Sequence, residues 1–348
     1  MKIAFTSCMS ATAYPNQPVW KTIQDQNPDA LVLLGDSIYN DCPHISIGSK
    51  MVHPKELTDI AFCNHMHDLY IQQLAVPEFK LLIGKFPIYS IWDDHDFLWN
   101  DADAKHSYSI HHRGKAYYSS QLFKCWQDAL AGNPFPANTS DPRVQSNYKT
   151  PLTEAYDNYM PAYQQIKFSA IKYNLKDDII LHLTNGRSWR KGDNLLGTAQ
   201  RNEITNIIEN KKNANAIHLI ASGSNFSRNG SQGWAGYSKD YDWLLKIADS
   251  YRTILLSGDI HHNEFSSHQS LSKNQYFYDA TSSGAAIDFL RVHNNGLSTT
   301  KDRLNYSEHF GILDIHSDGS VQASFYDHGV IDSKVPSFVI KSTFTNPV

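Results

Sequence analysis

The chain lacks the features that mark membrane, secreted and disulfide-rich proteins. No apolar run in its 348 residues approaches the roughly 20 residues that a membrane helix requires. The N-terminus runs from Met1 to Thr6 into a predicted strand, without the apolar segment and cleavage site of a signal peptide. The four cysteines are widely spaced and indicate no disulfide framework. We therefore expect a cytoplasmic protein with no membrane segment.

Several functional signatures are also missing. The formal net charge of −4 gives no electrostatic footprint for nucleic acid. The sequence contains neither a Gly-Lys-Ser/Thr phosphate-binding loop nor a Gly-x-Ser-x-Gly elbow, which argues against nucleotide triphosphatases and serine hydrolases. With 41% hydrophobic and 19% charged residues, the chain has the composition of a globular protein.

What is present is an alternation of predicted strands and helices. Strands are expected at 2–5, 30–34, 87–92, 166–173, 179–183, 216–221 and 253–257, with more after residue 310 around the turn Ser317–Gly319. Helices are expected at 18–26, 55–74, 115–130, 198–210 and 241–250. This mixture predicts an α/β fold of two packed sheets with helices outside. No linker divides the chain, so we expect a single domain spanning residues 1–348.

Acidic and histidine side chains gather where three of these strands end. The strands are followed in turn by Gly35-Asp36-Ser37-Ile38-Tyr39, by Asp93-Asp94-His95-Asp96 and by Gly258-Asp259-Ile260-His261. In open α/β sheets, ligand sites form at the C-terminal ends of the strands. Carboxylates and imidazoles that converge from separate strands predict a hydrolytic site with more than one metal ion.

Each motif taken alone leaves a structural alternative open. Asp36 could bridge two cations beside a Tyr39 phenolate that suits ferric iron, or the two could cap a helix and pack in the core. The acids around His95 could bind metal or form an exposed turn, and His95 itself could bind metal or donate to a phosphoryl oxygen. Asp259 and His261 share one face of an extended stretch, but they could also be a helix cap and a surface histidine.

Two further candidates are equally ambiguous on their own. Cys8, just after the first strand, is either a small buried apolar residue or a thiolate ligand of a trivalent metal. Arg187 and Arg190 follow the strand 179–183. Arginine suits bidentate phosphate recognition, although a solvated or salt-bridged pair is the simpler interpretation of this stretch.

In their joint order, these motifs resemble the PhoD-like (alkaline phosphatase D) family of the calcineurin-like metallophosphoesterases. The resemblance rests on segments 5–8, 35–39, 92–96 and 257–261, with weaker echoes at 187–190, 196–200, 281–283 and 310–311. It implies an α/β fold in the form of a four-layer α/β/β/α sandwich, with the metal site at the C-terminal edges of the sheets. It also implies a metal-dependent phosphoric ester hydrolase, a phosphodiesterase or phosphomonoesterase in which a metal-activated water attacks phosphorus in line.

The resemblance further implies a centre of two or more metals, ferric iron together with calcium or another divalent ion. Its implied ligands are Cys8, Asp36, Tyr39, Asp94, Asn100, Asn225, Asp259 and His261. Cys8, Tyr39 and His261 would hold the iron with Asp36, which would bridge to the second metal. Asp94 and Asp259 would complete that second site, Asn225 would add a ligand, and Asn100 would contribute to an extra divalent site.

The implied catalytic residues are His95 and Arg187. His95 would steady the phosphoryl group or protonate the leaving alkoxide, and Arg187 would hold a phosphate oxygen. Two positions depart from the family pattern: Asn185 stands where an Asp is usual, and Asp96 stands where many members have Glu. The charge lost at Asn185 could weaken a second or third metal site.

The expected substrate is a small-molecule or lipid-derived phosphoester, and the sequence predicts no particular oligomeric state. Two alternative functions stay open. One is a metal-binding or partner-binding descendant of the fold without catalysis. The other is a phospholipase-like diesterase, for which the sequence offers no exposed amphipathic helix.

Overall fold

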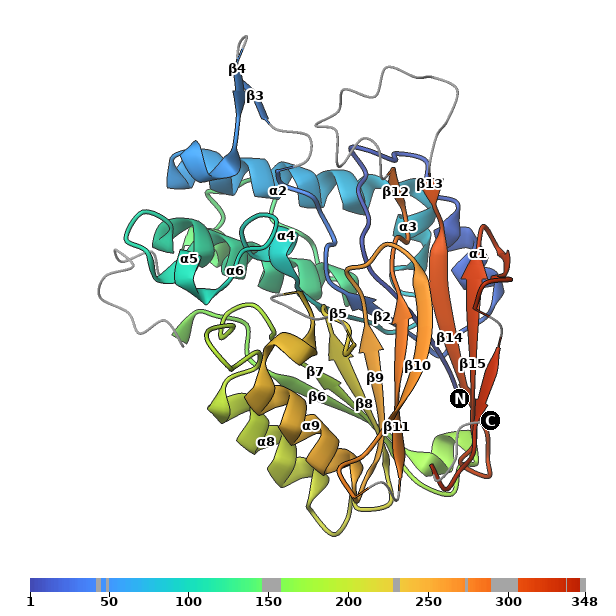
Figure 1. The fold of residues 1–348 in the computed structure, drawn as a ribbon. Coiled ribbons are helices and arrows are strands. Elements are labelled where there is room, and N and C mark those ends of the chain that lie inside the picture. Colours follow the sequence, from blue (N-terminus) through green and yellow to red (C-terminus); the bar gives the residue numbers. More distant parts are fainter. Residues whose placement is uncertain are drawn as a thin grey trace.

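A first β-sheet carries the N-terminal and C-terminal strands of the chain (Figure 1). The computed structural model describes residues 1–41, 45–47, 50–145, 158–227, 232–272, 275–288, 306–335 and 337–344. The strand order is β16-β15-β14-β1-β2-β5, and β17 pairs with β15. The strands are β1 (Lys2–Thr6), β2 (Ala30–Leu34), β5 (Ile88–Ile91), β14 (His309–Ile315), β15 (Val321–Asp327), β16 (Val330–Ile331) and β17 (Phe338–Ile340). Strands β1, β2 and β5 run parallel, so their C-terminal ends meet at one edge.

The second sheet is built from the middle of the chain in the order β10-β11-β9-β8-β7-β6. Its strands are β6 (Gln164–Phe168), β7 (Ile179–Leu183), β8 (Ile217–Ser222), β9 (Arg252–Ser257), β10 (Asn263–Gln269) and β11 (Tyr276–Ser282). The four central strands are parallel, and the two outer strands pair antiparallel to them. This sheet therefore also presents a common C-terminal edge.

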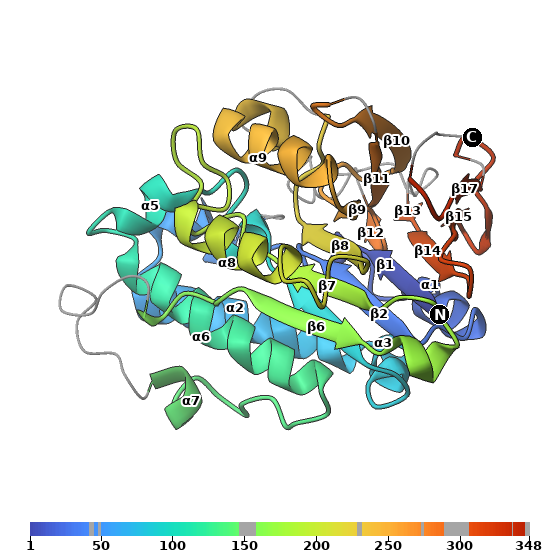
Figure 2. The same cartoon turned by 90° about the horizontal axis from the view of Figure 1, so that it is seen from below.

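Helices cover the outer face of each sheet. Four of them, α1 (Val19–Asp25), α2 (Asp59–Ala75), α3 (Pro77–Leu82) and α6 (Arg113–Leu130), pack on the first sheet. Helices α8 (Thr198–Ile208) and α9 (Ser238–Ala248) pack on the second, and Figure 2 shows the two groups on opposite sides of the sheets.

The residues of each strand alternate between the two sides of their sheet. In β1, Ala4 packs toward the helices, while Ile3 and Phe5 join apolar residues of the second sheet in a core between the sheets. This alternation is what a strand buried on both faces requires. The predicted four-layer α/β/β/α sandwich is confirmed.

Besides short 3₁₀ turns, the described chain has several smaller elements. They are the helices α4 (Asp94–Phe97), α5 (Ala104–Tyr108) and α7 (Pro142–Gln145), the hairpin β3 (Ile45–Ile47) and β4 (Lys50–Val52), and the short pair β12 (Ile287–Asp288) and β13 (Tyr306–Ser307). Among the described residues, no helix is both long and apolar enough to cross a bilayer.

One predicted strand is shorter than expected. The sequence predicts a strand at 166–173, but β6 ends at Phe168 and a 3₁₀ turn occupies Ala170–Tyr173. The turn forms because the Asp178 carboxylate accepts the backbone N–H of Ala170 at 2.8 Å, and it ends at Asn174, whose φ is 54°. An asparagine accepts this left-handed conformation more readily than most residues.

Candidate metal centre and active site

The predicted site residues lie in tight turns at the C-terminal edges of both sheets. Cys8 follows β1, Asp36 follows β2, and Asp259 and His261 follow β9. All four have positive φ values, of 63°, 51°, 74° and 56°. Such left-handed residues are uncommon outside glycine and collect at functional sites. The extended backbone predicted for 259–261 is therefore wrong, because the chain turns sharply after Ser257.

The structure brings together the four residues expected around the first metal. Cys8 Sγ lies 3.4 Å from Asp36 Oδ2, and Tyr39 Oη lies 2.8 Å from His261 Nε2. Cys8, Asp36 and Tyr39 are buried. Burial raises the pKa of Cys8 to about 11 and raises the pKa values of Asp36 and Tyr39 well above their usual ranges. A cation would remove this cost of burying anionic groups, so the donor set fits a metal ion.

Carboxylates form a second group around Asp36. The ligand atoms of Asp36, Asp93 and Asp259 lie within 4.8 Å of one another, and so do those of Asp36, Asp94 and His95. Asp36 is common to both groups, as a bridging ligand would be. Asp93, to which the sequence assigned no role of its own, stands beside Asp259, whereas Asp94 stands beside His95. Burial and the nearby carboxylates of Asp93 and Asp94 raise the pKa of Asp259 to about 7.

Arg187 is a fully buried cation at the centre of this acidic group. Its Nε and Nη2 atoms bind both carboxylate oxygens of Asp93, the latter at 2.8 Å, and Nη2 lies 3.6 Å from Asp94 Oδ2. Its Nη1 is buried and has no hydrogen-bond partner in the described part of the chain. Burial opposes ionisation of Asp94, but the charges of Arg187 and His95 outweigh it and lower the pKa of Asp94 to about 2.

His95 is paired with an acid that the sequence analysis missed. His95 Nδ1 lies 2.6 Å from Asp41 Oδ1, and the other oxygen of Asp41 accepts the backbone N–H of Asn100 at 2.9 Å. Burial lowers the pKa of His95, but the charges of Asp41, Asp94 and Asp36 outweigh it and raise that pKa well above its usual range. Asp41 follows the Gly-Asp-x-x-Tyr motif by two residues, which is the one sequence signal that could have drawn attention to it.

The two predicted amide ligands lie in different settings. The Asn100 side chain is exposed and donates to Asp101 Oδ2 at 3.0 Å, while its backbone N–H serves Asp41. Asn225 follows β8 and is buried, and its carbonyl accepts the N–H of Trp234 at 3.0 Å. Asn225 is therefore buried at the sheet edge that carries the acids, whereas the Asn100 side chain lies on the exposed side of the residues around Asp41.

Asp96 and Ser283 form hydrogen bonds that fix the positions of the predicted ligands. Asp96 accepts the backbone N–H groups of Ser37 and Asp93, each at 3.1 Å, and so joins the turns after β2 and β5. Ser283 Oγ donates to Cys8 Sγ at 3.2 Å and accepts the N–H of His261 at 3.0 Å. Sequence reasoning recorded both positions but gave neither a role in placing predicted ligands.

The described strands and helices form a metallophosphoesterase-like α/β fold. The family model of the PhoD-like phosphatases matches residues 3–123. A solved structure titled "Structure of PhoD" matches with a TM-score of 0.63 at 15% identity, covering 100% of this chain and 71% of that one. A search of curated proteins found no match. The predicted resemblance to the PhoD-like phosphatases is thus confirmed, and it supports a phosphoesterase function.

Proposed function

We propose that this protein is a metal-dependent phosphoric ester hydrolase. The observation that carries the proposal is the position of Asp36, which belongs to two groups of potential ligands, one with Asp94 and His95 and one with Asp93 and Asp259. The fold and the family match point to the same chemistry. Two nearby cations that share a carboxylate suit in-line displacement at phosphorus.

The first metal, ferric iron, would be held by Cys8, Tyr39, His261 and Asp36. Asp36, Asp94 and Asp259 would hold the second, calcium or another divalent ion, with Asn225 as a further ligand and Asn100 toward an extra site. Asp93 also offers a carboxylate there. When bound, such metals supply an activated water and neutralise charge on the phosphoryl oxygens.

Arg187 and His95 would act on the substrate directly. Asp93 fixes the Arg187 guanidinium through two of its nitrogens, which leaves Nη1 for a phosphate oxygen. Asp41 can only accept a hydrogen bond when ionised, so His95 Nδ1 carries the proton that it shares with Asp41. Nε2 is therefore the atom of His95 that would face the phosphoryl group or donate to the leaving oxygen.

The proposal is tested by hydrolysis of bis-p-nitrophenyl phosphate and p-nitrophenyl phosphate. The purified protein is assayed before and after chelation, and then with iron and calcium restored. We expect hydrolysis that is lost with the chelator and returns with metal, and the ratio of the two rates measures diester against monoester preference. A folded, metal-bound protein that cleaves neither ester would contradict the proposal and favour a metal-binding or partner-binding descendant.

A further inference from the structure

Asn185 lies two residues after the end of β7 and two residues before Arg187, and its side chain is buried. Its Oδ1 atom accepts Trp92 Nε1–H at 2.8 Å and the backbone N–H of Ser188 at 3.1 Å. Its Nδ2 atom donates to the Pro161 carbonyl and to the Ser188 hydroxyl, each at 2.8 Å. The carboxamide therefore uses both of its donors and both of its acceptor sites.

These contacts join the two sheets at the site. Trp92 and Asp93 follow β5 of the first sheet, whereas Asn185 and Arg187 follow β7 of the second. Trp92 bonds to Asn185, and the next residue, Asp93, pairs with Arg187. The same two turns are thus tied by two neighbouring links, one between neutral groups and one between charges.

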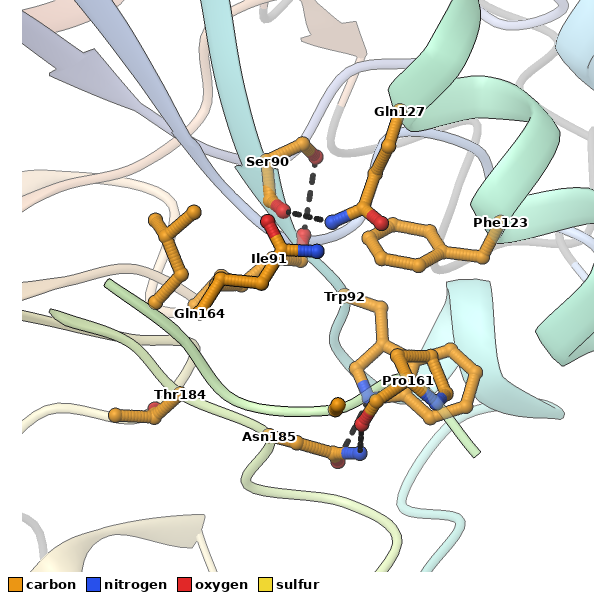
Figure 3. A pocket seen from close by; sticks show the side chains of 11 residues that line it. Ser90, Ile91, Trp92, Phe123, Gln127, Pro161, Gln164, Thr184 and Asn185 are labelled. Carbon is orange, nitrogen blue, oxygen red and sulfur yellow. Dashed lines mark hydrogen bonds between the residues drawn. The ribbon is translucent and has the colours of Figure 1, made fainter. Parts of the chain in front are cut away.

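The surroundings restrict how this link can move. Figure 3 shows Trp92, Pro161 and Asn185 together at one side of a small pocket, with Ser90 and Gln127 at the other. The Asn185 backbone is fixed as well, because Gln200 bonds to its N–H at 2.8 Å and to its carbonyl at 3.1 Å. A turn held at its backbone and its side chain leaves the following Arg187 little freedom.

The site requires an amide here and not a carboxylate. A carboxylate could still accept from Trp92, but it has no N–H for the Pro161 carbonyl 2.8 Å away. Two acceptors would then face each other in a buried place, which is costly. Asn185 also bonds to none of the candidate metal ligands in the described chain, so the expectation that its missing charge weakens a metal site has no contact to support it.

We infer that Asn185 is a positioning residue that sets the Arg187 guanidinium against the metal-ligand cluster. It does so through its hydrogen bonds to Trp92 and to the Pro161 carbonyl. The inference rests on the proposed function, because it takes Arg187 to hold a phosphate oxygen. Asn185 itself touches neither the substrate nor the predicted ligands, and it acts through Arg187. Its loss should therefore weaken phosphate binding only while Arg187 is present.

The test is a double-mutant cycle read by calorimetric binding of inorganic phosphate to the metal-loaded protein. N185D keeps the shape of the side chain and an acceptor for Trp92, but it removes both amide donors and adds a charge. W92F removes the link between Trp92 and Asn185 without adding charge. We expect each to weaken phosphate binding about tenfold. In an R187K background, which keeps the charge but loses the planar fork, neither should cause a further loss.

Asn213 provides a matched control far from the site. Its Nδ2 also donates to a backbone carbonyl, that of Ile207 at 2.8 Å, so N213D makes the same chemical change elsewhere and should leave phosphate binding intact. Unchanged binding in N185D and W92F, or an equal loss with and without Arg187, would overturn the inference. If N185D does not fold, W92F decides alone. Wild-type protein that binds no phosphate would overturn the role of Arg187 as well.

Discussion

Two buried histidines in the second sheet make the stability of the fold dependent on pH. His182 in β7 and His218 in β8 are fully buried, and their Nε2 and Nδ1 atoms lie 3.1 Å apart. His218 Nε2 faces the Asn213 carbonyl at 3.3 Å, and Tyr163 Oη lies 2.6 Å from His182 Nδ1. Because the carbonyl can only accept, His218 donates to it, His182 donates to His218, and Tyr163 donates to His182. In this arrangement each ring carries one proton and is neutral, and a second proton on either ring would have to displace a donor that already points at it.

The size and sign of the effect follow from linkage. Burial lowers the pKa of His218 from 6.5 to about 4 and lowers that of His182 well below its usual value. Between these pKa values the unfolded chain binds protons that the folded chain refuses, so stability falls as the pH falls. For His218 alone, the free energy of unfolding should decrease by about 2 kcal/mol from pH 7 to pH 5.

The measurement is urea unfolding of the wild type and of H218Q at pH 7 and pH 5. Glutamine can accept from His182 and donate to Asn213, but it does not titrate. Groups away from this pair contribute in the same way to both proteins, so the difference between their pH dependences reports His218 together with its coupling to His182. We expect the loss of stability on acidification to be smaller in H218Q by about 2 kcal/mol. The same pH dependence in both proteins would refute the reasoning.

Three further predictions concern the site. D41N removes the charge 2.6 Å from His95 and should slow turnover roughly 10²–10⁴-fold with metal retained, and H95A should do the same. The double variant should be no slower than H95A, and additive losses in kcat would contradict this pairing. S283A removes the hydroxyl between Cys8 and His261, and elemental analysis during chelator titration should show the first metal lost at roughly 10–100-fold lower chelator activity. D36A should abolish binding of both metals, and a variant that keeps either one at wild-type stoichiometry would exclude Asp36 as the bridge.

The layers could be predicted because apolar runs mark buried strands. Residues 30–34 and 179–183 are continuous apolar or nearly apolar segments, and both form strands with the predicted bounds. The strand β10 was missed because its sequence, from Asn263 to Gln269, is largely polar at the edge of the sheet. There the strand is stabilised by pairing with β11 and not by a periodic apolar pattern.

For the site, the sequence predicted which residues lie together at the C-terminal edges of the sheets, but not how their side chains are arranged. Order along the chain placed Cys8, Asp36 and Asp259 at the ends of strands that turned out to be neighbours across two sheets. The direction of each side chain was not predictable, because it depends on turns with positive φ that have no periodic pattern. The pairing of Asp41 with His95 joins residues that are 54 positions apart in the sequence, which no local pattern predicts.

The glycines of the strand-end motifs explain why the acids can come so close. A Cβ added to Gly35 or to Gly223 would overlap the side chain of Asp93, and Gly35 also has a φ of 100° that other residues rarely adopt. These two glycines come from different sheets and close on Asp93 from both, so the carboxylate is enclosed by backbone. Enclosure excludes the water that would otherwise solvate the charge, and the Arg187 guanidinium replaces that solvation. The acidic cluster therefore requires a glycine at position 35, because any larger residue would push Asp93 away from Arg187, whose charge offsets the cost of burying the Asp93 carboxylate.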